Sequence, residues 1–445
     1  KHLYMPVMEP STFQELKDWI GLAFELSEQT RLYFAYLITS NQADGGGTVQ
    51  VRPNQYPKLT FKNPVTIETS EISTDDRVII PPHTTVKEVE VLEQRFPRLL
   101  GLVREHGINQ ILYPPDSGKK QIGFVTSSLA FCYLEHALTL ANLDGKIPIL
   151  KFGVTHPIDP DILKTFAGMV DEIYVVEEKR AFLEEQVTSA LQMLHQSGEL
   201  DAFRVWGKRF PGGQAGFPNS KGMDPSIVFQ VLAPLLKTLD DPSLPVDRKL
   251  IDRTVALMEE TKAYDLAASV RTPSFCPGCP HRDSASVLDK MIDDFQDASY
   301  MHHHHGRDPV DLVFHGDIGC YSLLKYKPFN RLMHNLSGMG LGGGTGAGID
   351  PFIRNKQLVF MGDSTFFHSG MAAISDSIKH GQDIAYIILD NKTTAMTGHQ
   401  PTPGVDVDIM GHPTFAQDIE QVVRGMAGGE GRPPTMIGRV NPADR

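Results

Sequence analysis

The polar residues of "FMGDSTFFHSG" (360–370) follow an apolar run at the point where a helix is predicted to begin. Asp363 could be the N-cap of that helix, which is a common use of aspartate. Asn391 follows 28 residues later, where the next apolar run gives way to the hydroxyl-rich "NKTTAMTGHQPTPG". Asp and Asn oxygens, with backbone and phosphate oxygens, make an octahedral Mg²⁺ site. The pair therefore predicts a diphosphate held through magnesium at a helix N-terminus, with Gly362 allowing close approach of the backbone.

A second group consists of three cysteines. Cys276 and Cys279 form a Cys-x-x-Cys pair in "FCPGCPHR", and Cys320 follows 41 residues after the pair in "HGDIGC". A Cys-x-x-Cys turn presents two thiolates to one metal ion or cluster. These thiols therefore predict metal, cluster or redox chemistry.

Three kinds of site fit this cysteine pattern. A thioredoxin-type dithiol needs a thioredoxin-like setting, of which only the following helix is indicated. A zinc site needs a fourth ligand, such as His281 or His315. An iron–sulfur cluster needs a fourth cysteine, and only Cys132 is left. Because Cys132 lies in the apolar helical stretch "SSLAFCYLEHAL", we expect it to be a buried small hydrophobe. Spacing alone favours zinc and a cluster equally.

The elements that position these residues are three predicted strands, at 311–317, 357–364 and 384–391. Each is continuously apolar, as expected for strands buried on both faces of a parallel sheet. Each ends in Gly-Asp or Asp-Asn. Since ligands bind beyond the carboxyl ends of such strands, the three polar ends predict one cleft.

The rest of the chain indicates further α/β organisation. Residues 117–205 alternate strands with helices, which predicts a second parallel sheet. "EPSTFQELKDWIGLAFELSEQT" predicts a capped amphipathic helix with Glu15 in its first turn. The expected fold class is α/β, with several domains built on doubly wound parallel sheets. The predicted segments are 1–50, a linker at 51–116 containing one helix, 117–205, a Gly- and Pro-rich connector at 206–255, and 256–445.

Composition excludes several classes of function. The net charge of −12 argues against nucleic acid as the main partner. No apolar run approaches the length that spans a bilayer. Four cysteines in 445 residues exclude a disulfide scaffold and indicate a reducing compartment, which predicts a cytoplasmic protein. The abrupt first and last residues predict that both ends are truncated relative to the natural chain.

Two further stretches and two histidines remain. "SGMGLGGGTGAGID" (337–350) could be a phosphate loop, but it lacks the Lys-Ser/Thr of a P-loop, so we expect a closely packed helix instead. "MHHHHGRD" (301–308) is expected to be a polar loop that binds metal only incidentally. His399 and His368 lie near the predicted diphosphate site in sequence, and His399 is the stronger candidate to contact cofactor or substrate.

The motifs together resemble a known family. The Gly-Asp-Ser and Asp-Asn pair resembles the signature of thiamine diphosphate enzymes, and "TGHQ" resembles the T-G-G-Q stretch of 2-oxoacid:ferredoxin oxidoreductases. "FCPGCPHR", "GDIGCYSL", "GDSTFFHSGM" and "LDNKTTAMTGHQPTPG" resemble the alpha subunits of indolepyruvate ferredoxin oxidoreductases. The resemblance implies that Asp363, Asn391 and the carbonyl of Thr393 hold Mg²⁺. Further cofactor contacts are implied at Gly316, Asp317, Ile318, Gly362, Ser364, Thr365, Thr397 and Gly398.

The same resemblance assigns Cys276, Cys279 and Cys320 to a [4Fe–4S] cluster, whose fourth cysteine is absent from this sequence. It implies a thiamine diphosphate-binding fold at 256–445, a transketolase C-terminal-like domain at 117–205, and the end of a pyrimidine-binding domain at 1–50. The glutamate that activates the cofactor in this family would lie before Lys1.

The activity implied by the resemblance is oxidative decarboxylation of an aryl or branched 2-oxo acid. Coenzyme A would take the acyl group, and electrons would pass through the cluster to ferredoxin. A smaller subunit would complete a hetero-oligomer. Two alternatives remain: a non-redox thiamine diphosphate decarboxylase or carboligase, and a non-catalytic zinc-binding scaffold subunit of a redox complex.

Overall fold

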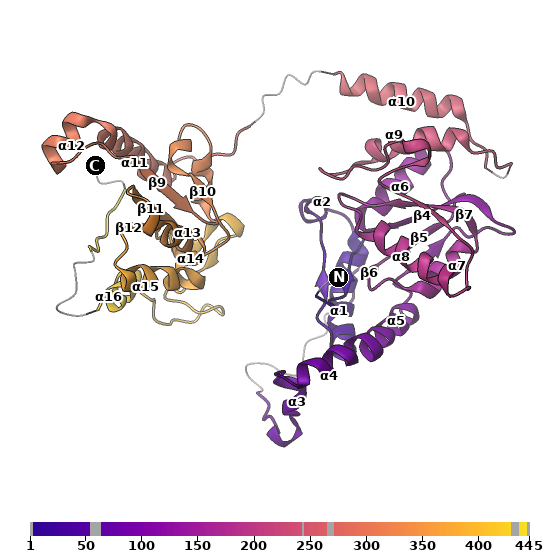
Figure 1. Ribbon diagram of the computed structural model, residues 1–445, viewed down its shortest axis with the longest axis horizontal. Coiled ribbons are helices and arrows are strands. Elements are labelled where there is room, and N and C mark those ends of the chain that lie inside the picture. The colour runs from indigo at the N-terminus through magenta and orange to yellow at the C-terminus, as the bar shows by residue number, and fades with distance from the viewer. Residues whose placement is uncertain (1–2, 54–63, 243, 265–270, 429–435, 443–445) are drawn as a thin grey trace. The chain divides into compact units, whose positions relative to one another are not determined.

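The computed structural model describes residues 3–53, 64–242, 244–264, 271–428 and 436–442. The chain divides into two compact units, residues 1–266 and 267–445, each with its own sheets (Figure 1). Each unit also has its own buried hydrophobic clusters. No helix in the described ranges combines the length and the apolar character needed to cross a membrane.

The first unit is built on a five-stranded sheet with the order β3-β5-β4-β7-β8. Its neighbouring strands are parallel except β3, which runs antiparallel to β5 at one edge. The strands are β3 (Gln110–Leu112), β4 (Lys120–Ser127), β5 (Ile149–Phe152), β7 (Val170–Val176) and β8 (Arg204–Trp206).

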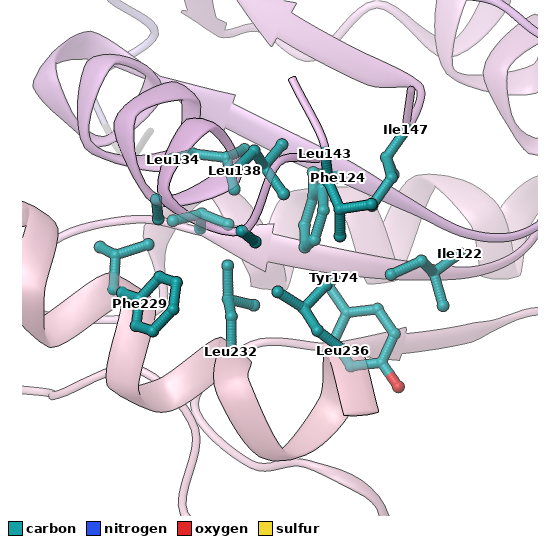
Figure 2. Packing of buried hydrophobic residues seen from close by; sticks show 14 of the residues in the cluster. Ile122, Phe124, Leu134, Leu138, Leu143, Ile147, Tyr174, Phe229, Leu232 and Leu236 are labelled. Atoms are coloured by element: carbon teal, nitrogen blue, oxygen red, sulfur yellow. The ribbon is translucent and has the colours of Figure 1, made fainter. Parts of the chain in front are cut away.

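Side chains of this sheet alternate between two cores, because successive residues of a strand point to opposite faces. On β4, Phe124 lies in one core and Val125 in the other. Helices α6 and α9 cover the first face, as Figure 2 shows for Leu134 of α6 and Leu232 of α9. Helices α7 and α8 cover the second face. The helices are α6 (Ser128–Leu140), α7 (Pro160–Ala167), α8 (Phe182–Gln196) and α9 (Pro225–Thr238).

Two expected segment limits differ from the structure. The predicted connector at 206–255 contains α9, and its Phe229 and Leu232 are fully buried. "PSIVFQVLAPLLKT" is apolar on most sides because it packs on both the sheet face and α10 (Arg248–Lys262), so it lacks the amphipathic pattern of a surface helix. The predicted linker at 51–116 also supplies the edge strand β3.

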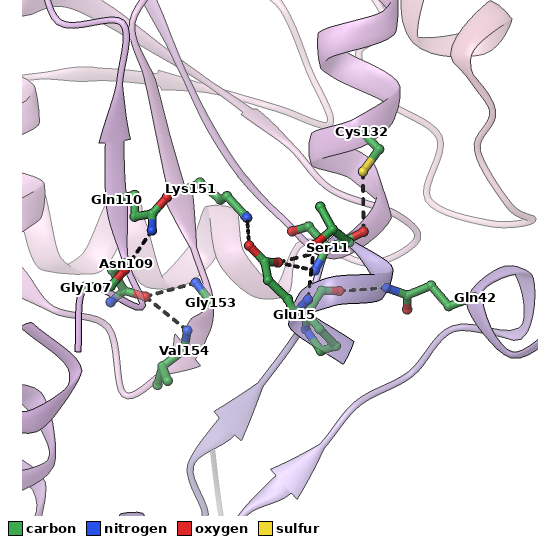
Figure 3. Close-up of polar contacts among 12 residues, drawn as sticks. Ser11, Glu15, Gln42, Gly107, Asn109, Gln110, Cys132, Lys151, Gly153 and Val154 are labelled. Atoms are coloured by element: carbon green, nitrogen blue, oxygen red, sulfur yellow. Dashed lines mark hydrogen bonds and ion pairs between the residues drawn. The ribbon is translucent and has the colours of Figure 1, made fainter. Parts of the chain in front are cut away.

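The N-terminal segment packs against this α/β sheet through polar contacts. Helix α1 (Phe13–Thr30) begins with the predicted capping box between Thr12 and Glu15. Glu15 also accepts a hydrogen bond from the backbone N–H of Ser11 at 2.8 Å and forms an ion pair with Lys151, which is only 4% exposed (Figure 3). A buried lysine needs such a partner, so this pair fixes α1 on the sheet.

Smaller strands continue this attachment. β1 (Val7–Met8) pairs in parallel with β2 (Ala35–Tyr36) and antiparallel with β6 (Val154–His156). Cys132 is half-buried against the first core, as expected, and its thiol donates to the carbonyl of Ser11 at 3.3 Å (Figure 3). The predicted helix of the linker is present as a continuous run of α4 (His83–Glu90), a π-helical turn (Val91–Arg95) and α5 (Phe96–Glu105).

The second unit is built on a parallel sheet with the order β10-β9-β11-β12, and it contains all three predicted strands. α11 packs on one face of this sheet, whereas α13 and α15 lie on the other. Helices on both faces confirm the predicted doubly wound α/β class. The strands are β9 (Leu312–Gly316), β10 (Asn335–Leu336), β11 (Lys356–Gly362) and β12 (Ile384–Leu389), and the helices are α11 (Pro280–Gln296), α13 (Gly342–Ile349) and α15 (Met371–His380).

The glycine-rich stretch forms the closely packed helix α13, as expected. A Cβ on Gly342 would lie 2.9 Å from the carbonyl carbon of Gly316, and one on Gly343 would lie 2.7 Å from the Cβ of Ala373. Only glycine allows backbones to approach this closely. The residues of α13 thus bring the helix against the end of β9.

The histidine tract differs from expectation. It ends a helix, α12 (Ala298–His305), where a polar loop was predicted. The side chain of Asp297 caps the helix by accepting from the N–H of Tyr300, and Gly306 ends it in the left-handed conformation. The remaining α-helices of at least four residues in the described ranges are α2 (Ser40–Asp44), α3 (Thr74–Arg77) and α16 (Ile419–Ala427).

Candidate functional site at the carboxyl end of the second sheet

The strand ends meet as the sequence predicts. β11 and β12 pair in parallel up to Gly362 opposite Leu389, so Asp363 and Asn391 follow neighbouring strands at one edge of the sheet. Helix α14 (Asp363–Thr365) starts at once and continues through a π-helical turn (Phe366–Gly370) into α15. The N-cap is Gly362, and Asp363 is the first helical residue. Capping therefore does not account for this aspartate.

Asp363 is a buried acid. Its residue is 2% exposed, and its carboxylate oxygen Oδ2 accepts a hydrogen bond from the hydroxyl of Thr402 at 3.0 Å. Burial raises the pKa of Asp363, while the bonds from Thr402 and from the N–H of Ser364 act in the opposite direction. A carboxylate in such a place favours a cation as its partner.

The hydroxyl-rich stretch after β12 folds back as a short hairpin. β13 (Thr393–Thr394) pairs antiparallel with β14 (Gln400–Pro401). Thr394 donates its hydroxyl to that of Ser364 at 2.9 Å, and Asn391 Oδ1 accepts from the N–H of Thr393 at 3.1 Å. The hairpin is thus tied to the start of the helix that carries Asp363.

Asp317, a predicted cofactor contact, turns into the protein. It is fully buried, and its carboxylate accepts from the hydroxyl of Tyr321 and from the N–H of Gly340 at 3.2 Å. Burial raises the pKa of Asp317. These contacts join the end of β9 to the turn that leads into α13. The next predicted contact, Ile318, is 46% exposed and lies where a ligand can reach it.

The hairpin tip carries the other predicted contacts. The hydroxyl of Thr397 donates to the side chain of Gln400 at 2.9 Å, and Gly398 has a φ of +131°. His399 is exposed, has a φ of +60° and donates its backbone N–H to the carbonyl of Thr394. His368 is also exposed and contacts Ser369 at 2.9 Å. The side chain of His399 therefore lies exposed to solvent at the tip of the hairpin.

The cysteines lie in the same unit. The N–H of Cys279 bonds to the carbonyl of Cys276 at 3.2 Å, which makes the expected turn, and Cys279 is the N-cap of α11. Burial raises the pKa of the Cys320 thiol, and the charges of Cys279 and Cys276 raise it further. Within the described ranges, no three His, Cys, Asp or Glu side chains are gathered closely enough to hold a metal ion.

The two candidate fourth ligands for zinc do not form a group with two of the cysteines among the described residues. His315 is buried in β9, where Nε2 lies 2.9 Å from the side-chain oxygen of Gln357. His281 packs edge-on against Phe275 with ring centroids 6.2 Å apart, and burial lowers its pKa.

The donor set fits the diphosphate end of the predicted cofactor better than it fits the cluster. Asp363 is a buried carboxylate at a helix N-terminus, and Asn391 supplies an amide oxygen at the neighbouring strand end. These are the oxygen ligands that Mg²⁺ takes with phosphates. Three thiols, in contrast, leave a tetrahedral or cubane site one ligand short.

Sequence reasoning missed two residues that organise the site, Thr402 and Tyr321. Thr402 is 5% exposed and bonds to Asp363, and Tyr321 joins Asp317 to Thr365. For Thr402 the sequence contains a signal, because this residue belongs to the hydroxyl-rich stretch that follows Asn391. For Tyr321 the sequence gives none, since an aromatic residue after Cys320 is ordinary in a buried turn.

Comparison with known proteins supports this description. Residues 317–441 match the family model described as "Thiamine pyrophosphate enzyme, C-terminal TPP binding domain". Residues 115–262 match the model described as "Indolepyruvate oxidoreductase domain". The second match includes all of α9 and α10, which agrees with their place in the first unit.

Curated relatives match along nearly the whole chain. Indolepyruvate oxidoreductase subunit IorA of Archaeoglobus fulgidus is 27% identical over 95% of this chain and 59% of its own length. The subunit of the same name from Methanothermobacter marburgensis is 28% identical over 95% of this chain and 60% of its own length. The chain thus spans about 60% of the length of these relatives. The resemblance to indolepyruvate oxidoreductase alpha subunits is confirmed.

Among solved structures, a 2-oxoglutarate:ferredoxin oxidoreductase from Magnetococcus marinus is 17% identical, with a TM-score of 0.26 over 36% of this chain and 53% of that chain. At that score the likeness supports no argument about this protein.

Proposed function

We propose that this chain is the thiamine diphosphate-binding part of a 2-oxoacid:ferredoxin oxidoreductase. The observation that carries the proposal is the buried Asp363, which sits at a strand end and a helix start and is tied to the hairpin that follows the neighbouring strand. The matches to a thiamine pyrophosphate-binding domain and to indolepyruvate oxidoreductase subunits support it.

In this proposal Asp363, Asn391 and the backbone carbonyl of Thr393 hold Mg²⁺, which in turn holds the diphosphate. α14, the π-helical turn and α15 form one continuous run, and the N-terminus of this run also favours the negatively charged diphosphate. Further contacts come from the hairpin and from the segment after β9, which displays Ile318. When bound, thiamine diphosphate supplies the electron-accepting ring that lets a 2-oxo acid lose CO₂.

The remaining tasks of the chain are orientation and electron exit. We assign Cys276, Cys279 and Cys320 to a [4Fe–4S] cluster, with the fourth ligand from outside this sequence. Coenzyme A accepts the acyl group, a smaller subunit completes the hetero-oligomer, and ferredoxin takes the electrons. The substrate is an aryl or branched 2-oxo acid such as indolepyruvate. Four free cysteines agree with a reducing, cytoplasmic setting.

Domain roles follow from the same proposal. Residues 1–50 are the end of a pyrimidine-binding domain, and 51–116 link it to the α/β domain at 117–205, which extends through α9. The second unit, residues 267–445, binds the diphosphate, so the expected boundary at 256 moves beyond the end of α10. His399, at the exposed hairpin tip, is a candidate for contact with the substrate.

The test is a joint measurement of iron, acid-labile sulfide, zinc and thiamine diphosphate on the natural protein purified without oxygen. The proposal expects one thiamine diphosphate and about four irons per site, and viologen reduction that depends on both a 2-oxo acid and coenzyme A. Thiamine diphosphate without iron would leave the non-redox decarboxylase. Zinc alone would leave the scaffold subunit.

A further inference from the structure

Thr402 is an unusual hydroxyl in its stretch of chain. Its neighbours Pro401 and Pro403 are exposed, whereas Thr402 is 5% exposed and points inward to Asp363. Proline fixes the backbone φ on each side. The side chain is therefore presented to the carboxylate from a stiff backbone, so that little conformational entropy is lost in making the bond.

The direction of the hydrogen bond follows from the number of protons. A threonine hydroxyl has one proton to donate. Thr402 Oγ1 lies 3.4 Å from the N–H of Gly404, from which it accepts, and 3.0 Å from Asp363 Oδ2, which as a carboxylate can only accept. The single proton is therefore directed at Asp363, which makes this a charge-assisted bond.

The backbone of Thr402 closes the base of the hairpin. Its N–H donates to the carbonyl of Lys392 at 3.4 Å, just outside the paired strands β13 and β14. One residue thus fixes both the hairpin that follows β12 and the carboxylate that follows β11. The second tie, between Thr394 and Ser364, lies on the other strand of the hairpin.

We propose that Thr402 is a positioning residue for the cation site: its hydroxyl fixes Asp363 Oδ2, leaves Oδ1 to the metal ion, and sets the hairpin against the carboxylate. The inference rests on the proposed function and deepens it. Thr402 touches neither metal nor diphosphate in this arrangement. It acts through Asp363, and through the position of the hairpin that carries Thr393.

The decisive comparison is Thr402→Val against Thr402→Ser. Valine keeps the shape and loses the hydroxyl, while serine keeps the hydroxyl and loses a methyl group. Thr414→Val is the matched control, because Thr414 is exposed in the same unit. Two quantities are measured on the full natural protein after cofactor removal: the Mg²⁺-dependent affinity for thiamine diphosphate by calorimetry, and amide exchange of the hairpin without cofactor.

We expect Thr402→Val to weaken Mg²⁺-dependent binding by about 10- to 100-fold, as for other bonds to charged groups. Exchange of the Thr402 and His399 amides should become about tenfold faster. Thr402→Ser should restore most of both effects, and Thr414→Val should change neither.

Each other outcome has a clear meaning. Wild-type-like binding by Thr402→Val would overturn the inference while leaving the proposed function in place. Equal losses in the valine and serine variants would overturn it too, because they would show that packing is what matters. If the wild-type protein binds no thiamine diphosphate with Mg²⁺, the proposed function fails and this inference fails with it.

Discussion

An aspartate side chain is charged in water at neutral pH, but that of Asp363 is buried. Burying the charge costs free energy unless a cation or hydrogen bonds compensate for the lost water. Its side-chain bond to Thr402 compensates only in part, since burial remains the largest influence on its pKa and raises it. Residues that bind ligands are commonly kept at some expense of stability. At the scale of single residues, this side chain is the one on which the proposed function depends most.

The first prediction concerns this buried charge. Asp363→Asn should weaken the Mg²⁺-dependent affinity for thiamine diphosphate by at least about 100-fold, because a neutral amide is a far poorer Mg²⁺ ligand than a carboxylate. The cofactor-free melting temperature should stay the same or rise, because a buried charge is removed. Calorimetric titration and thermal unfolding measure both, with the exposed Asp376→Asn as control. Unimpaired binding would contradict the assigned role.

Glu177 is a second buried acid, and it lies in the first unit. It follows β7, is 6% exposed, and accepts backbone N–H bonds from Leu183 and Glu184 at 2.7 and 3.0 Å. Burial raises its pKa from 4.5 to about 7, although these bonds and the nearby Lys208 act against the rise. The folded state therefore binds this proton more tightly than the unfolded state does.

The second prediction follows from that sign. The stability that the proton contributes is fully present below about pH 4.5 and is lost as pH rises through about 7. Relative to Glu177→Gln, which cannot titrate, the free energy of unfolding of the wild type should fall by up to roughly 3 kcal/mol over this range. Urea unfolding at a series of pH values measures it. A constant difference, or a rise with pH, would contradict the prediction.

At the scale of elements, the close packing of α13 positions the site. The buried glycines of this helix let it lie directly against the end of β9, and Asp317 accepts from Gly340 just before the helix. Glycine normally weakens a helix, by about 1 kcal/mol relative to alanine. Its repeated use here indicates that close approach to the strand ends outweighs helix propensity.

The third prediction compares two glycines of that helix. Gly342→Ala should destabilise the protein by roughly 1–3 kcal/mol, because its Cβ would lie 2.9 and 3.0 Å from backbone atoms of Gly316, which cannot easily move. Gly344→Ala has open space within 4 Å and should stabilise slightly. Thermal unfolding of both variants measures the contrast. Equal effects would show that the packing is looser than described.

At the scale of the whole molecule, the chemistry-bearing residues are concentrated in one of two units. The second unit holds the candidate Mg²⁺ ligands and three of the four cysteines. The first unit holds Cys132, which packs against a core and bonds to Ser11. The four cysteines therefore divide into a structural one and three candidates for electron transfer.

The fourth prediction tests that division in the natural complex. Cys276→Ser, Cys279→Ser and Cys320→Ser should each lose most of the bound iron and slow viologen reduction at least about tenfold, because each removes a cluster ligand. Cys132→Ser should keep its iron. Metal analysis after anaerobic purification measures this. Iron that survives all three substitutions would place the cluster on other residues.

The sequence alone determined the periodic features of this protein. Continuous apolar runs ending in Gly-Asp and Asp-Asn were enough to predict β9, β11 and β12, their parallel order and the shared edge of Asp363 and Asn391. A strand buried on both faces must be apolar throughout, whichever residues cover it. The capping box of α1 follows in the same way from a local rule.

Tertiary structure decided whatever depends on contacts between distant segments. α9 was missed because a helix buried on several sides loses the amphipathic pattern that marks helices in a sequence. The tract at 302–305 became helical through the caps supplied by Asp297 and Gly306. Asp317 points into the protein, whereas Asp363 accepts a hydrogen bond from Thr402. Each arrangement depends on which hydroxyl or N–H group lies within about 3 Å of the carboxylate. The spacing of residues along the chain carries no such information.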